Sequence, residues 1–272
     1  MPIELGGHIF STPHLVLEEA VRIWRALGIS VMDLGNGRDL NPEVVAANPD
    51  REAERVLEIG DRHAMRFHDA FPQATDKHIT NTPDAEEYDH QAAVYAGWIR
   101  FAKAVGLNGL SLSPGKYWAG MDVETAFVRG RDQLRPLMDL ASDAGVCLRI
   151  EPHVESVTWS PELALRMLDE VQGLSLTVDH SHFVFHGLPY EQIAMMHPFG
   201  THWHARQAAL GFLQTGFDEG EIDFARIVDD LSESGYQGVI ALEVVNIGWM
   251  NLDRSDVLGE TVRLRDYLRG LL

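Results

Sequence analysis

The sequence predicts a single α/β domain built as a (β/α)8 barrel over residues 1–272. Short apolar runs alternate with longer segments of helical period along the whole chain, and this alternation is typical of a parallel sheet with helical crossovers. Eight such runs can be counted, and a barrel of this kind takes about 250 residues. No linker rich in Gly, Ser or Pro and no shift in composition indicates a second domain.

Each predicted strand is a short apolar run that ends at a turn or at a polar residue. Ile29–Leu34, for example, is followed by the turn Gly35-Asn36-Gly37. Because neighbouring strand residues face opposite sides of a sheet, alternate residues of each run are expected to point into the barrel. The eight runs are Gly6–Ser11, Ile29–Leu34, Met65–His68, Leu107–Ser113, Val146–Glu151, Leu174–Asp179, Thr201–Arg206 and Gly238–Val245.

The crossovers between these runs carry apolar residues at helical spacing. Ser160 stands ahead of Pro161 as a helix cap, and Gly173 ends that helix. The sixth crossover, His186–Gly200, has the weakest helical pattern, and Ala70–Thr82 is expected to be a mobile loop. Other helices are expected over Asp50–His63, Val123–Ala144, Asp223–Ser234 and Arg254–Leu268.

Charge and composition narrow the classes of partner. The chain has 22 Lys and Arg against 41 Asp and Glu, a formal net charge of −19, which repels nucleic acid and anionic membranes at long range. No apolar stretch approaches the roughly 20 residues that span a bilayer, and the first residues are neither basic nor apolar. The single cysteine, Cys147, rules out an internal disulfide. We therefore expect a cytoplasmic protein with a small-molecule partner and no nucleic acid or membrane.

Polar residues at the strand ends are the candidates for chemistry, because the loops after the strands of a barrel meet on one face. Glu151 is followed at once by Pro152, which removes the next ladder donor and takes the chain out of the sheet. From the fifth strand onward, every strand ends in a good ligand for a divalent ion. The eight strand-end residues are His8, Asp33, His68, Ser113, Glu151, Asp179, His204 and Glu243.

Three carboxylates crowded at one end of a barrel repel one another, so either one of them binds a proton or a cation neutralises them. Glu151, Asp179, His204 and Glu243 suit one divalent ion, either manganese, magnesium, cobalt or zinc, better than a thiol-seeking metal. The alternative is that the four side chains lie at different distances from the barrel axis and form hydrogen bonds within their own loops.

Five segments of the second half carry a resemblance to a known family. They are Ile150-Glu151-Pro152, Val178-Asp179-His180-Ser181-His182, His202-Trp203-His204, Glu219-Gly220-Glu221-Ile222-Asp223-Phe224 and Ala241-Leu242-Glu243. With them the chain resembles the xylose isomerase-like TIM barrel superfamily of sugar and sugar phosphate isomerases and epimerases, which also contains the apurinic endonucleases. The resemblance implies that Glu151, Asp179, His204 and Glu243 hold one divalent ion, and that Glu151 and Glu243 also act as acid and base.

Further residues are candidates for substrate binding. The resemblance implies that His182, three residues after Asp179, contacts a substrate oxygen. Arg206 shares strand parity with His204 where many relatives have an acid, so it could select an acidic or oxidised sugar or pair with one of the acids.

Three other histidines are less certain candidates. His153 shares parity with Glu151 and is either a base, a substrate contact or a solvated loop residue. His8 and His68 could line the floor of the pocket or pack in the core.

The leading hypothesis is a metal-dependent isomerase or epimerase that acts on a ketose or related sugar. Glu151 and Glu243 would transfer a proton next to a metal-chelated carbonyl, through an enediolate. The alternative is a lyase or dehydratase, either dehydroshikimate dehydratase-like or a C-glycoside-cleaving subunit acting on a keto sugar, with His153 or His182 as proton carrier. An apurinic endonuclease and a non-catalytic sugar-binding barrel are less favoured. A homo-oligomer or an accessory subunit is left open.

Overall fold

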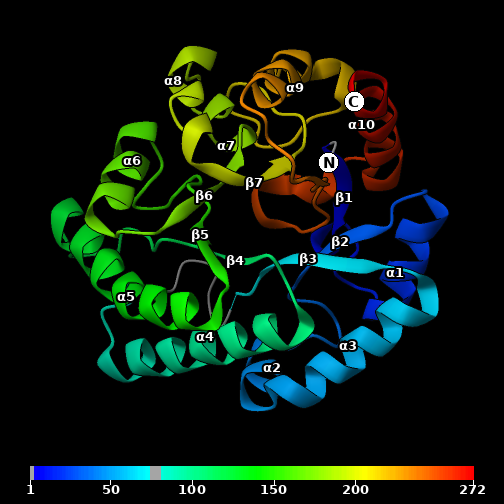
Figure 1. Cartoon of the computed structure of the whole chain (residues 1–272). Coiled ribbons are helices and arrows are strands. Elements are labelled where there is room, and N and C mark those ends of the chain that lie inside the picture. The colour runs from blue at the N-terminus through cyan, green and yellow to red at the C-terminus, as the bar shows by residue number, and fades with distance from the viewer. Residues whose placement is uncertain (1–2, 74–80) are drawn as a thin grey trace.

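A computed structural model describes residues 3–73 and 81–272 and confirms the (β/α)8 barrel (Figure 1). The eight strands form one parallel sheet in the order β3-β2-β1-β8-β7-β6-β5-β4. Their bounds are β1 Glu4–His8, β2 Val31–Gly35, β3 Arg66–Phe71, β4 Gly109–Leu112, β5 Cys147–Ile150, β6 Ser175–Asp179, β7 Gly200–Ala205 and β8 Val239–Leu242. All eight predicted runs therefore contain a strand.

The helices surround this sheet (Figure 1). They are α1 Leu17–Ala26, α2 Pro42–Ala47, α3 Pro49–His63, α4 Ala85–Val105, α5 Val123–Ala144, α6 Pro161–Glu170, α7 Ser181–Val184, α8 Tyr190–Ala194, α9 Phe224–Glu233 and α10 Val257–Leu271. The predicted cap of α6 is confirmed, because the Ser160 side chain accepts a hydrogen bond from the Leu163 amide. No helix among the described residues is long and apolar enough to cross a membrane.

Several predicted bounds were wrong. The run Gly6–Ser11 is a strand only to His8, whose ring nitrogen accepts a hydrogen bond from Phe10 N and starts a 3-10 helix over Ile9–Ser11. In contrast, β3 continues to Phe71, three residues past its predicted end. The weak sixth crossover, His186–Gly200, contains only the short helix α8 and a 3-10 turn at His197–Phe199. Most of the loop expected at Ala70–Thr82 lies outside the described residues.

The barrel closes between β3 and β4. In the described part of the chain these two strands share no ladder, but Asn108 N donates a hydrogen bond of 2.7 Å to His68 O. Ser111 Oγ on β4 also donates to the Asp69 carboxylate on β3, at 2.9 Å. Both backbone and side-chain hydrogen bonds therefore close the barrel between β3 and β4.

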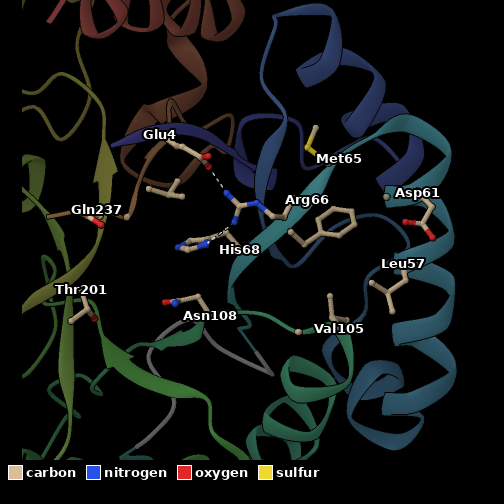
Figure 2. Close-up of a pocket in the computed structure, with 15 residues that line it drawn as sticks. Glu4, Leu57, Asp61, Met65, Arg66, His68, Val105, Asn108, Thr201 and Gln237 are labelled. Carbon is tan, nitrogen blue, oxygen red and sulfur yellow. Dashed lines mark hydrogen bonds and ion pairs between the residues drawn. The ribbon is translucent and has the colours of Figure 1, made fainter. Parts of the chain in front are cut away.

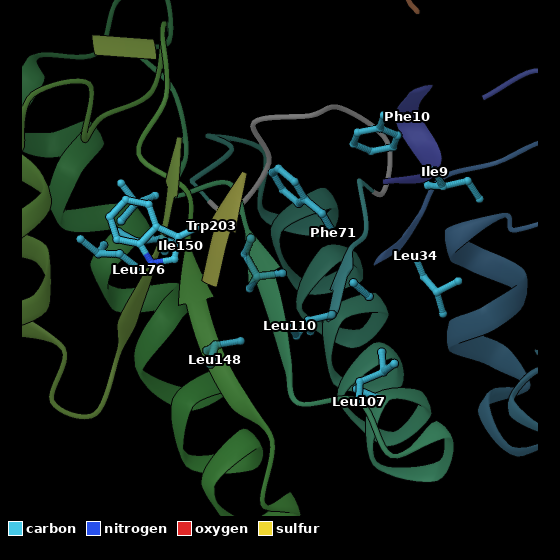
Figure 3. Close-up of a cluster of buried hydrophobic side chains, with 14 of the residues drawn as sticks. Ile9, Phe10, Leu34, Phe71, Leu107, Leu110, Leu148, Ile150, Leu176 and Trp203 are labelled. Carbon is cyan, nitrogen blue, oxygen red and sulfur yellow. The ribbon is translucent and has the colours of Figure 1, made fainter. Parts of the chain in front are cut away.

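The two faces of the sheet differ in chemistry. The apolar face packs under the helices and includes Leu110, Leu148, Leu176 and Trp203 (Figure 3). The residues between them point to the barrel interior and are polar and buried; they are Ser111, Arg149, Thr177 and His202. This parity carries on to the strand ends, so the next inward residues of β5 to β8 open onto the same face of the barrel.

Candidate active site

The ends of four successive strands bring together three carboxylates and one imidazole. Glu151 and Glu243 directly follow β5 and β8, and their amides donate to Leu112 O at 3.1 Å and to Ala205 O at 3.0 Å. Asp179 is the last residue of β6, and it is the register partner of His204 on β7. All four side chains are buried. The four predicted ligands therefore lie at one end of the barrel, on neighbouring strands.

His204 lies between the two glutamates. Its Nδ1 is 2.7 Å from Glu151 Oε1 and 3.3 Å from Glu243 Oε2. Glu151, His204 and Glu243 each offer a ligand atom within 4.8 Å of the others, and so do Glu151, Asp179 and His182. Glu151 belongs to both groups and joins them into one cluster.

Two carboxylate oxygens support the fit of this cluster to a cation. Among the described residues, Asp179 Oδ2 and Glu243 Oε2 are buried and form no hydrogen bond, but each faces the guanidinium of Arg206, at 2.9 and 3.4 Å. Buried acceptors of this kind cost free energy unless a charge or a donor meets them. Oxygen and imidazole nitrogen are also the ligands that manganese, magnesium, cobalt and zinc accept. The donor set therefore fits a divalent ion.

The two glutamates have different proton affinities. Burial raises the pKa of Glu151 to about 7. Burial alone would also raise the pKa of Glu243, but His204 and Arg206 lower it below the ordinary value. Two carboxyl groups whose pKa values are pushed apart are suited to act as an acid and a base.

A cavity of about 170 Å³ opens beside these carboxylates. Its polar wall includes Glu151, Glu243 and three of the predicted substrate-binding residues, namely His153, His182 and Arg206. Its apolar lining includes Phe10, Phe71, Trp249 and Leu252. The cavity thus has polar groups that can orient a ligand and an apolar wall that limits water, as small-molecule sites do.

The two pocket histidines lie side by side, with ring centroids 5.4 Å apart. His153 Nε2 is 3.2 Å from Ser113 Oγ, and the Val154 amide donates to His182 Nδ1 at 3.2 Å. Both rings are buried, so they are fixed parts of the wall.

The other two predicted substrate-binding residues do not line this cavity. His8 lies beneath it, fully buried, with Nδ1 3.8 Å from Glu243 Oε1. His68 lines a larger cavity of about 760 Å³ at the amino-terminal ends of the strands, where it contacts Arg66, which in turn pairs with Glu4 (Figure 2). His68 was expected at a strand end, but β3 continues beyond it, which explains its different position.

A family model described as xylose isomerase-like TIM barrel matches residues 21–268 of the chain. The chain belongs to this family. Part of the chain is also 29% identical, over 129 residues, to an uncharacterized protein of Methanocaldococcus jannaschii, and this match spans 42% of each protein.

Solved structures share the fold over nearly the whole chain. A 3-keto-D-glucoside 4-epimerase from E. coli superposes with a TM-score of 0.77 at 14% identity, covering 98% of this chain and 99% of the other. A D-psicose 3-epimerase from Clostridium cellulolyticum gives 0.78 at 13% identity, with 99% of both chains covered. A D-allulose 3-epimerase from Methylomonas gives 0.76 at 17% identity and covers 100% and 98%.

Sequence reasoning missed some contacts of this xylose isomerase-like barrel. Ser181 Oγ accepts a hydrogen bond of 2.8 Å from Arg206 Nε, and the Ser181 amide donates to Asp179 Oδ1 at 2.8 Å. Deeper in the barrel, His202 Nε2 lies 2.7 Å from Asp33 Oδ2. The strand parity of His202 and Asp33 was visible in the sequence. The hydrogen bonds of Ser181 depend on the turn after β6 and left no signal there.

Proposed function

We propose that the chain is a divalent-metal-dependent sugar isomerase or epimerase, with Glu151, Asp179, His204 and Glu243 as metal ligands. The observation that carries the proposal is the convergence of these four buried side chains, three of them carboxylates, at the mouth of the barrel. Three solved structures with the same fold bear the names of sugar epimerases, which supports a sugar as substrate. Manganese, magnesium, cobalt and zinc are all candidate ions.

A divalent ion at this site would polarise the carbonyl and the neighbouring hydroxyl of a keto sugar. Glu151 and Glu243 line the cavity from β5 and β8, on either side of His204. One glutamate removes the proton from the carbon beside the carbonyl, and the other returns a proton to the resulting enediolate.

The remaining polar residues of the cavity position the sugar. His153 and His182 line the cavity, and their Nε2 atoms, which contact Ser113 Oγ and Arg206 Nη2, can exchange these contacts for substrate hydroxyl groups. The apolar wall that includes Phe10 and Trp249 packs against the C–H face of a sugar and excludes water from the proton transfer.

Deuterium exchange tests this function. The protein is incubated with each candidate ion and a panel of ketoses and keto-glycosides in deuterated water. We expect deuterium at the carbon beside the carbonyl, and a loss of about 10²–10⁴-fold in exchange for Glu151→Gln and Glu243→Gln. Glu162→Gln, which removes an exposed acid of α6, is the charge-matched control and should keep full exchange. A lack of exchange with every sugar would contradict the proposal, and so would full turnover by Glu243→Gln.

The position of His153 favours a second candidate, a lyase or dehydratase. His153 lines the cavity close to Glu151 and could carry a proton to a leaving group. The same incubations distinguish this reaction, because elimination gives a product lighter by one water, or a released aglycone, instead of an isomer of equal mass. His153→Gln should then abolish product release while sparing deuterium exchange.

A further inference from the structure

Arg206 holds a buried permanent charge inside the carboxylate cluster. It lies one residue beyond β7, and its side chain is buried. Its Nη2 is 2.9 Å from Asp179 Oδ2, and its Nη1 is 3.4 Å from Glu243 Oε2. These are the two oxygens that lack a hydrogen-bond partner among the described residues. The guanidinium therefore faces the same acceptors that an ion would use.

The position of the guanidinium is fixed by its other contacts. Nε donates to Ser181 Oγ at 2.8 Å, and Nη2 lies 2.8 Å from His182 Nε2. A neutral imidazole has a single lone pair, and the Val154 amide already donates to His182 Nδ1. The oxygens of Ser181, Asp179 and Glu243 are therefore the main partners of Arg206.

The acids of the cluster face two groups that can carry a positive charge, His204 between the two glutamates and Arg206. Glu151, Asp179 and Glu243 are three buried acids, and Arg206 is the permanent cation that contacts two of them. Buried carboxylates without a partner are costly, and a guanidinium stays charged in proteins. Arg206 and a divalent ion would also repel each other across a few ångströms of low-dielectric interior.

We propose that Arg206 is a positioning residue that neutralises part of the negative charge that a metal ion would otherwise neutralise. It holds the Asp179 and Glu243 carboxylates in place in the metal-free barrel and thereby weakens the affinity of the site for the ion. The identity of the ligands rests on the function proposed above. This role differs from that of a receptor for an acidic sugar. A receptor for an acidic sugar would direct its N–H groups at the ligand, whereas each nitrogen of the Arg206 guanidinium lies within 3.4 Å of an oxygen of Ser181, Asp179 or Glu243.

Calorimetric titration with Mn²⁺ alone tests the proposal, on wild-type protein and on Arg206→Gln. We expect the variant to bind Mn²⁺ at least about 10-fold more tightly, because the repelling charge is gone. Thermal unfolding gives a second readout. Without metal the variant should melt about 10 °C lower, and Mn²⁺ should raise its midpoint more than that of the wild type. A purely structural role would lower the midpoints with and without metal equally and would not tighten binding.

Two further variants serve as controls. Arg206→Lys keeps the charge and should stay close to the wild-type affinity, and it remains informative if Arg206→Gln does not fold. Arg263→Gln removes an exposed arginine that pairs with Asp218 at 2.8 Å and should change neither readout.

The outcomes separate this inference from the proposed function. If wild type and Arg206→Gln bind Mn²⁺ equally, or the variant binds it more weakly, the inference is wrong while the metal-dependent function stands. If only the variant binds the ion, Arg206 replaces the metal outright, and the metal-dependent function is wrong. If neither binds it, both are wrong.

Discussion

Arg149 and Arg206, both buried in the barrel, differ in the number of carboxylates around them. Toward the amino-terminal ends of the strands, Arg149 pairs with the single carboxylate of Asp69 and donates to Asn108 and to Thr201. Toward the carboxyl ends, Arg206 faces two carboxylates and has a third, Glu151, in the same cluster. The first set has one carboxylate for one arginine, whereas the second has three carboxylates in the cluster around one arginine. A surplus of this kind indicates where the barrel can take up a ligand.

Breaking the Arg149–Asp69 ion pair should have the largest effect on stability. Asp69→Ala leaves the Arg149 guanidinium buried without its carboxylate, so the free energy of unfolding should fall by about 3–5 kcal/mol. Urea denaturation measures this free energy, and its loss should be the same with and without Mn²⁺. Asp139→Ala, an exposed substitution on α5, should stay within about 0.5 kcal/mol of wild type. A stability loss for Asp69→Ala that metal repairs would contradict the comparison.

Removing one acid from the cluster around Arg206 should lower the metal affinity more than the stability. Asp179→Asn removes a proposed ligand but leaves one carboxylate for Arg206. We expect the affinity for Mn²⁺ to fall about 100-fold, which is about 2.7 kcal/mol. The stability of the metal-free protein should change much less than in Asp69→Ala. Unchanged Mn²⁺ affinity in the calorimeter would remove Asp179 from the ligand set.

His68 should make the amino-terminal region sensitive to acid. Burial, together with the smaller effect of nearby His202, lowers the pKa of His68 from the ordinary 6.5 to about 4. The unfolded chain therefore binds this proton at a higher pH than the folded one, so stability is present above pH 6.5 and is lost as the pH falls toward 4. His68→Gln should lose about 1–3 kcal/mol less than wild type over that window, as measured by denaturation at each pH. If the stability of His68→Gln and of wild type falls equally with pH, His68 does not contribute to the acid sensitivity.

The smallest effect is expected for Ser181→Ala. This change removes the hydroxyl that accepts from Arg206 Nε but keeps the charge of Arg206, and it should cost about 1 kcal/mol of stability. Metal affinity should change less than about threefold, since the carboxylates and the guanidinium remain. A tightening as large as that of Arg206→Gln would show that the position of the arginine matters more than its charge.

The sequence allowed the fold and the convergence of the last four strand ends to be predicted, for a physical reason. Inward parity and the position of Pro152 locate Glu151, and the same parity locates His204 and Glu243 on their strands. The prediction was wrong at β3, because a buried polar residue inside a barrel looks like a strand end. His68 and Asp69 continue the strand, since the interior offers Asp69 the partners Arg149 and Ser111.

The pairing of Arg206 could not be decided from the sequence. An arginine two residues after His204 is compatible with a receptor for an anion or with an ion pair, and strand parity treats both alike. Only the three-dimensional position of Ser181 and Asp179, set by the turn after β6, orients the guanidinium toward the acids.

The seam between β3 and β4 has a mechanical consequence. Every other pair of neighbouring strands is held by a ladder in the described part of the chain, whereas here Asp69 joins Ser111 and Arg149 across the gap. The Asp69 carboxylate thus has two roles: it neutralises Arg149 in the barrel interior, and it links β3 to β4 where the barrel closes. We expect the barrel to open first between β3 and β4, far along the sheet from β7 and β8, so that the edge with the proposed metal ligands can stay assembled while the opposite side opens.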